Sequence, residues 1–113
     1  MLQIDYEGPN RNRITLTKGD SAKLKLKLYD TQNKLLTLKE GDTAVLTIKQ
    51  NIDSEDVVLQ LTVDDAQQFT FAPADTTELE CGQYCYDIQV TLNDGSVYTV
   101  MPPSRFIIAR GVS

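Results

Sequence analysis

The sequence has 113 residues, of which 41% are hydrophobic and 24% charged, a balance that excludes an intrinsically disordered chain. Its net charge of -5 argues against a nucleic-acid partner, because nucleic-acid binding relies on clustered Lys and Arg. No apolar run approaches the ~20 residues that span a bilayer, and the first residues lack the pattern of a signal peptide. We therefore expect one domain over residues 1–113, of cytoplasmic origin, with no membrane partner.

The first residues carry an alternating apolar pattern, in which Leu2, Ile4 and Tyr6 are separated by polar residues. This pattern is typical of a short strand. Residues 1–8 could form an arm that adds a strand to a neighbouring subunit, or an edge strand that pairs within their own domain. Both interpretations make Leu2, Ile4 and Tyr6 candidates for an interface.

Alternation with a period of two then recurs in short segments, which predicts half-buried β-strands. The apolar positions are, in chain order, Ile14 and Leu16; Ala22, Leu24, Leu26 and Leu28; Ala44, Leu46 and Ile48; Val57, Leu59, Leu61 and Val63; Phe69 and Phe71; and Tyr84, Tyr86, Ile88, Val90 and Leu92. Helical spacing is nearly absent. One face of each strand is expected to meet the core and the other to meet water.

The residues between these segments are those of turns and loops. Asn93-Asp94-Gly95 predicts a tight hairpin, because Asp-Gly readily adopts the positive φ angles that such turns need. Residues 73–78 suit one helical turn in a crossover. Pro102 and Pro103 are expected to interrupt pairing before a last strand, because proline has no amide donor. Together these patterns predict an all-β, antiparallel, immunoglobulin-like sandwich of seven to nine strands.

Two residues late in the chain have specific expectations. Tyr84 lies near the start of a predicted strand and suits a tyrosine corner, in which the hydroxyl binds upstream backbone, although it could equally be an ordinary core aromatic. Ile107 stands between Phe106 and Ile108, so it points away from the core if its neighbours point inward. Another strand or another subunit should cover Ile107, which makes it an interface candidate.

Residues that could carry chemistry are sparse. The absence of histidine removes the commonest general base and the common catalytic triads. Cys81 and Cys85 are too few for a disulfide framework or a zinc site, and we expect both to stay reduced. Acidic residues at 53–56 and 64–65 lack the ordered spacing of a calcium loop and are interpreted as solvated turns. The sequence thus predicts no catalytic, cofactor-binding or metal-binding residues.

The order of strands and turns resembles the small β-sandwich domains encoded in tail modules of bacteriophages and prophages, and is similar to the N-terminal domain of phage upper baseplate proteins. The residues that carry the resemblance are Lys18-Gly19-Asp20, residues 38–49, residues 71–76, Leu79, Gly82, Tyr84, residues 86–88, Asp94-Gly95 and Thr99-Val100.

The resemblance implies a virion structural role without catalysis. Its partners would be other phage structural proteins or further copies of the chain, in the virion or, before assembly, in the host cytoplasm. A bacterial surface or adhesin-type module that binds carbohydrate or calcium is the alternative. The chain ends at Ser113, without the stalk and receptor-binding regions that follow in baseplate proteins.

Overall fold

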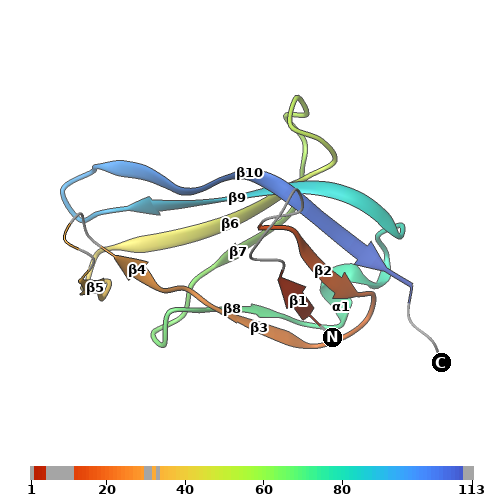
Figure 1. Cartoon of the computed structure of the whole chain (residues 1–113), viewed down its shortest axis with the longest axis horizontal. Helices are drawn as coiled ribbons and strands as arrows, with labels where there is room; N and C mark the ends of the chain where they lie inside the picture. The colour runs from red at the N-terminus through yellow and green to blue at the C-terminus, as the bar shows by residue number, and fades with distance from the viewer. Residues whose placement is uncertain (1, 5–11, 30–31, 33, 111–113) are drawn as a thin grey trace.

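The computed structural model describes residues 2–4, 12–29, 32 and 34–110. Its larger sheet contains, in spatial order, β1 (Leu2–Ile4), β2 (Ile14–Thr17), β10 (Val97–Ala109), β9 (Gly82–Thr91), β6 (Thr43–Lys49) and β7 (Val57–Thr62). The opposing layer pairs β3 (Ala22–Lys25) with β8 (Gln68–Phe71), and a small hairpin pairs β4 (Leu28–Tyr29) with β5 (Leu35–Leu36). Figure 1 shows the two layers, so the chain folds as the predicted immunoglobulin-like β-sandwich.

The strand pairing is antiparallel with one exception. Residues Phe106 to Ala109 of β10 run parallel to β2, while every other described pair is antiparallel. Because β3 and β4 are separated only by Leu26 and Lys27, they form one interrupted strand, which brings the described strands to about nine. The predicted strand number and fold class are therefore confirmed.

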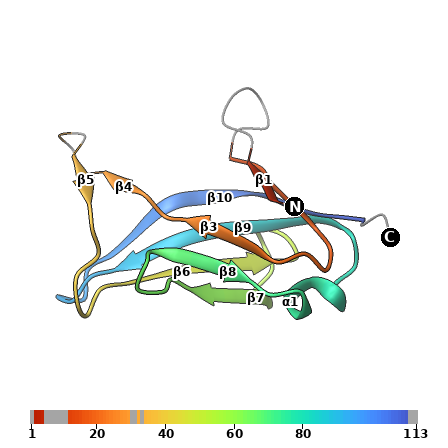
Figure 2. The same ribbon diagram turned by 90° about the horizontal axis from the view of Figure 1, so that it is seen from below.

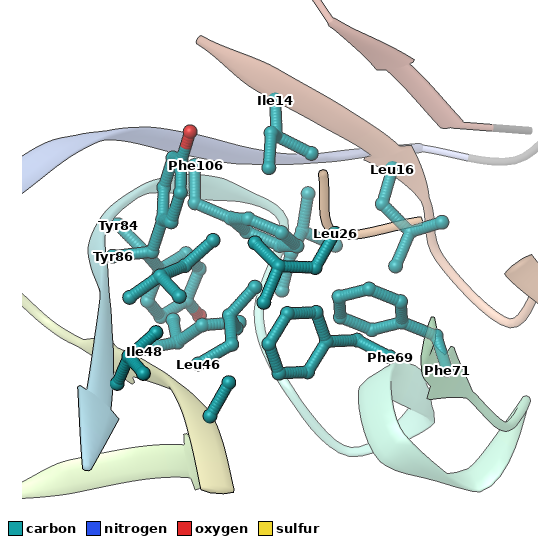
Figure 3. Close-up of a cluster of buried hydrophobic side chains, with 14 residues drawn as sticks. Ile14, Leu16, Leu26, Leu46, Ile48, Phe69, Phe71, Tyr84, Tyr86 and Phe106 are labelled. Atoms are coloured by element: carbon teal, nitrogen blue, oxygen red, sulfur yellow. The ribbon is translucent and has the colours of Figure 1, made fainter. Parts of the chain in front are cut away.

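The core lies between the layers and uses the predicted alternating positions (Figure 3). Its buried hydrophobic residues are Ile14, Leu16, Leu26, Ala44, Leu46, Ile48, Phe69, Phe71, Tyr84, Tyr86, Ile88, Val90, Phe106 and Ile108. Phe106 stands at the centre of the aromatic part, stacked on Phe71 at 5.9 Å and edge-on to Tyr86 at 6.1 Å between ring centroids. These aromatic contacts join β10 to its neighbour β9 and to β8 of the opposing layer.

Two buried tyrosines of β9 use their hydroxyls to hold backbone. Tyr84 Oη donates to the carbonyl oxygen of Glu80 at 2.7 Å, which is the upstream contact that a tyrosine corner requires. Tyr86 Oη donates to the carbonyl oxygen of Asn12 at 2.5 Å, 74 residues earlier in the chain. Tyr86 follows the corner by two residues, where antibody domains carry a disulfide cysteine. In this chain a hydrogen bond, not a disulfide, connects Tyr86 to the backbone just before β2.

Val57 does not lie on the core face of its strand, where the alternating pattern predicts it. Ile48 pairs with Leu59 but Lys49 pairs with Val57, so Val58 is an extra residue in a β-bulge. The bulge breaks the alternation, and Val57 is exposed. Leu59 and Leu61, beyond the bulge, pack against the core as predicted.

Pro102 and Pro103 interrupt the pairing as predicted, since neither has a partner on β9, but no separate last strand begins after them. β10 continues through both prolines, with register shifts between Thr99 and Met101 and between Met101 and Ser104. Prolines are tolerated in such a strand because bulges and open edges require no amide donor at those positions. β10 therefore joins the hairpin at one end of the sandwich to the core at the other.

The crossover between β8 and β9 contains the single turn α1 (Ala74–Thr77), as predicted for residues 73–78. Thr76 is fully buried, and its hydroxyl accepts a hydrogen bond from the amide of Gly19 at 2.8 Å. This bond fastens α1 to the turn between β2 and β3. No helix in the described ranges is long and apolar enough to cross a membrane.

Candidate functional site

An apolar groove opens at the end of the sandwich where the two layers differ in length. β9 and β10 have 10 and 13 residues, whereas β3 and β8 have 4 each. The shorter layer cannot cover the whole inner face of the longer strands. Figure 2 shows β4 and β5 standing apart from the layer, near the first half of β10. The resulting groove has a volume of about 750 Å³.

Aliphatic and aromatic side chains dominate the groove. Its lining comprises Leu28, Tyr29, Leu36, Thr37, Leu38, Lys39, Asp42, Val90, Leu92, Asn93, Asp94, Tyr98 and Val100. Tyr98 is 55% exposed, Tyr29 57% and Leu36 46%, whereas Phe69 in the covered part of the core is 0% exposed. The groove is thus an extension of the core that the second layer leaves open to solvent.

One wall of the groove is held by Gln67, whose backbone has a positive φ of 56°. Its side-chain amide donates to the carbonyl oxygen of Leu26 at 3.1 Å and accepts from the amide of Leu38 at 2.6 Å. Its own backbone carbonyl accepts from the amide of Leu26 at 2.8 Å. Leu26 and Leu38 stand at the two ends of the segment that carries β4 and β5. The hydrogen bonds to Gln67 therefore fix both ends of that segment to the sandwich.

The other wall is held by Asp42, just before β6. Its carboxylate accepts hydrogen bonds from the amide of Lys39 at 2.9 Å and from the amide of Asn93 at 2.8 Å. The second bond joins the turn before β6 to the β9–β10 hairpin. Gly41 has φ of +90° and lies against Asn93, where a Cβ would come within 2.9 Å of Asn93 Cγ. This close approach explains the glycine.

The edge of β10 beside the groove is open. β9 pairs with β10 from Val97 onward, but β2 pairs only with Phe106 to Ala109. Within the described part of the chain, the stretch from Val97 to Arg105 therefore has a neighbouring strand on one side only. Backbone N–H and C=O groups on such an edge can pair with an added strand.

The polar groups around the groove serve its structure. The Asp42 carboxylate is engaged by two backbone amides, and Asp94 accepts from the amide of Ser96 at 2.8 Å in the predicted hairpin turn. Hydrogen bonds from the Ser96 side chain and amide lower the pKa of Asp94. The groove thus offers an apolar contact surface with a charged rim.

The cysteines lie away from the groove, and both are free. Cys81 is exposed just before β9, and Cys85 is half-buried on that strand. Burial raises the pKa of the Cys85 thiol, and the nearby Asp87 carboxylate adds to the effect. A thiol with a raised pKa stays protonated at neutral pH, so Cys85 lacks the thiolate character of a nucleophile.

The acidic turns hold their own backbone. Asp64 Oδ1 accepts from the amides of Ala66 at 2.8 Å and Gln68 at 3.0 Å, which shapes the turn between β7 and β8. In the loop after β6, Asn51 and Ser54 side chains accept from the amides of Asp53 and Asp56. Across residues 2–4, 12–29, 32 and 34–110, no three His, Cys, Asp or Glu side chains gather as metal ligands would.

The residues proposed from the sequence as an interface lie elsewhere. Leu2 packs against the core from β1, which pairs with β2 of the same chain and so forms an edge strand in this structure. Ile4 is opposite Ile14 in that pairing, and Tyr6 lies outside the described residues. Ile107 is half-buried on the outer face, with its backbone between Thr15 and Gln83. β1 and β2 lie toward the opposite end of the sandwich from β4 and β5 (Figure 1), and neither strand contributes to the groove lining.

Sequence reasoning missed the groove because its residues follow the pattern of core residues. Leu28 and Val90 were expected to be buried, and nothing in their spacing shows that the opposing layer ends early. One usable signal is the pair Leu35-Leu36, where two consecutive leucines cannot both face one core from a strand. In the structure both are exposed.

Comparisons with known proteins add little to this site. No protein-family model matches the chain, and no curated protein sequence matches it. Among solved structures, the chain is similar to CopC from Methylosinus trichosporium OB3b, with 13% identity and a TM-score of 0.46. The match covers 88% of this chain and 85% of that chain. A likeness this distant bears on neither the groove nor the function.

Proposed function

We propose that the chain is a non-enzymatic structural protein of a bacteriophage or prophage particle, which contacts neighbouring tail or baseplate proteins. The observation that carries the proposal is the open groove, where apolar side chains that would normally be buried face solvent beside an unpaired strand edge. An exposed apolar surface of this kind suits a protein partner. The resemblance of the strand and turn sequence to phage tail modules supports the particle as its setting.

The chemistry of the groove favours a protein partner over a reaction. Tyr29, Leu36, Tyr98 and Val100 offer large apolar area, and the edge of β10 offers backbone hydrogen bonds. Protein interfaces combine these two contributions, with aromatic residues near the centre of the contact. Both carboxylates of the groove lining, Asp42 and Asp94, accept hydrogen bonds from backbone amides of their own chain, which leaves them poorly suited to acid–base work.

The test is whether the chain is part of assembled particles. Particles induced from a strain that carries the gene would be purified on a density gradient and analysed by quantitative mass spectrometry. We expect the chain to copurify with the tail proteins at a fixed copy number. Particles made by a strain lacking the gene should be incomplete and regain the missing part on complementation. Expression of the chain without its appearance in purified, intact particles would contradict the proposal.

The groove itself is tested with a variant that keeps the fold. Tyr98→Lys replaces an exposed aromatic with a charge and should leave the melting temperature nearly unchanged. It should reduce incorporation into particles if the groove is the contact surface. Val57→Lys is the matched control, since Val57 is an exposed apolar residue on β7, outside the groove lining. Equal incorporation of both variants would exclude the groove as the site.

A further inference from the structure

We propose that the open edge of β10 binds a second copy of this chain, with the two β10 strands antiparallel and their grooves joined across a two-fold axis. This inference deepens the proposed function and rests on it for its biological setting, because repeated contacts between copies of one chain build symmetric assemblies. The contact is isologous, so each copy presents the same stretch, from Asp94 to Arg105, to the other.

The first observation is that the edge has no charge to repel a second copy. Residues 96–104 are all uncharged in a chain whose net charge is -5. Exposed edges are commonly protected by charged side chains, above all lysine. In the described part of the chain, β2 stops pairing at Phe106, so the edge is accessible from Val97 to Arg105. The register shift after Thr99 and the prolines at 102 and 103 confine the regular pairing to Val97–Thr99.

The second observation is the charge at the two ends of this stretch. Asp94 precedes it in the hairpin turn, and the exposed Arg105 follows it. Antiparallel pairing reverses the direction of the second copy, so the Asp94 end of one chain meets the Arg105 end of the other. The two-fold axis produces this opposite-charge contact twice. Within one chain the two residues are separated by most of the length of β10.

Another uncharged edge of the sheet, that of β7, lacks this complementarity. β7 (Val57–Thr62) has no neighbour beyond it in the described sheet order, and its residues are also uncharged. However, Asp56 precedes β7, and Asp64 and Asp65 follow it closely. Antiparallel self-pairing would bring acidic residues together at both ends, which is unfavourable. The distribution of charge therefore selects β10 over β7 for a second copy.

The size of the surface determines the expected affinity. A standard interface buries roughly 800 Å² per partner, about a tenth of this chain's 7636 Å² of accessible surface. A few residues of strand pairing cover less than that, so the exposed side chains of Tyr98, Val100, Tyr29 and Leu36 must be buried as well. An interface at the lower end of the size range corresponds to reversible dimerisation, and we expect a dissociation constant in the micromolar range.

Sedimentation velocity across micromolar to millimolar concentrations tests the inference with the purified chain. Arg105→Glu places a carboxylate against Asp94 of the second copy and should raise the dissociation constant at least tenfold, since the loss of two surface ion pairs alone accounts for about tenfold and repulsion adds to it. The double variant Asp94→Lys with Arg105→Glu should restore dimerisation, because the pair is then reversed. Arg110→Glu, an exposed reversal beyond β10, is the matched control and should change little.

Three results would overturn the inference. The chain could remain monomeric throughout the range, or dimerise with equal affinity when Arg105 is reversed. Alternatively, Gln60→Lys on β7 could abolish dimerisation while Thr99→Lys on β10 leaves it intact, which would place the contact on the other edge. Thermal melts of every variant check that the fold persists. A monomeric chain that still enters particles refutes self-association alone, whereas a dimer absent from particles refutes the virion role alone.

Discussion

Replacing Phe106 with alanine is expected to lower the free energy of unfolding by about 3–5 kcal/mol. Phe106 is fully buried, stacks on Phe71 from the opposing layer and meets Tyr86 edge-on. Truncation removes both ring contacts and leaves a cavity at the point where the layers join. Because a domain of this size is stable by only ~5–15 kcal/mol, the variant would lose a large share of its stability. Urea titration followed by tyrosine fluorescence and circular dichroism measures the change.

Tyr98→Ala is the control for the Phe106 variant. Tyr98 is also an aromatic residue of β10, but it is more than half exposed. Its replacement should change the free energy of unfolding by no more than about 0.5 kcal/mol. A loss at Tyr98 as large as that at Phe106 would mean that the groove is filled in the folded chain, and so would contradict the open end described above.

Tyr86→Phe is expected to cost about 1–2 kcal/mol, although it removes only one oxygen atom. The hydroxyl donates to the carbonyl oxygen of Asn12 and connects β9 to the entry of β2. Phenylalanine leaves that carbonyl without this donor while keeping the ring packed on Phe106. The same urea titration measures the loss, and no change would show that the hydrogen bond contributes nothing in solution.

The same substitution has a signature in alkali. Burial raises the pKa of Tyr86 from its usual value of 10.0 to about 12. Between these values the unfolded chain loses the proton while the folded chain retains it, so stability falls as pH rises. Tyr86 lowers the free energy of unfolding by at most ~1.4 kcal/mol per pH unit in this range. Below pH ~10 its stabilising contribution is fully present. Tyr86→Phe should flatten the stability curve there. Parallel curves for the two proteins would contradict the assignment.

The core could be predicted because strand periodicity alone determines which side chains face inward. Leu24, Leu46 and Ile88 lie on the expected face, and the Asp94-Gly95 turn joins β9 to β10 as its residues require. Val57 departed from the pattern because a bulge at Val58 depends on the neighbouring strand and leaves no local signal. Pro102 and Pro103 interrupt the pairing as expected, but β10 continues past them because an open edge needs no amide donor.

The candidate site could not be predicted because it arises from a mismatch between layers. Whether Tyr98 is buried depends on how far β3 and β8 extend over β10, and that length is set by contacts distant in sequence. The clamp made by Gln67 is likewise long-range, since it joins Leu26 and Leu38 from a turn 41 and 29 residues away. A single sequence shows the apolar residues but not what covers them.

Hydrogen exchange with mass spectrometry on the free chain and on purified particles tests most directly whether the open end of the sandwich is the contact surface. We expect slower exchange in particles for the amides of Val97–Met101 that point away from β9 and for the β4–β5 hairpin, with β7 unchanged. Protection that appears on β7, or at neither place, would contradict the assignment of the groove and the β10 edge as the functional surface.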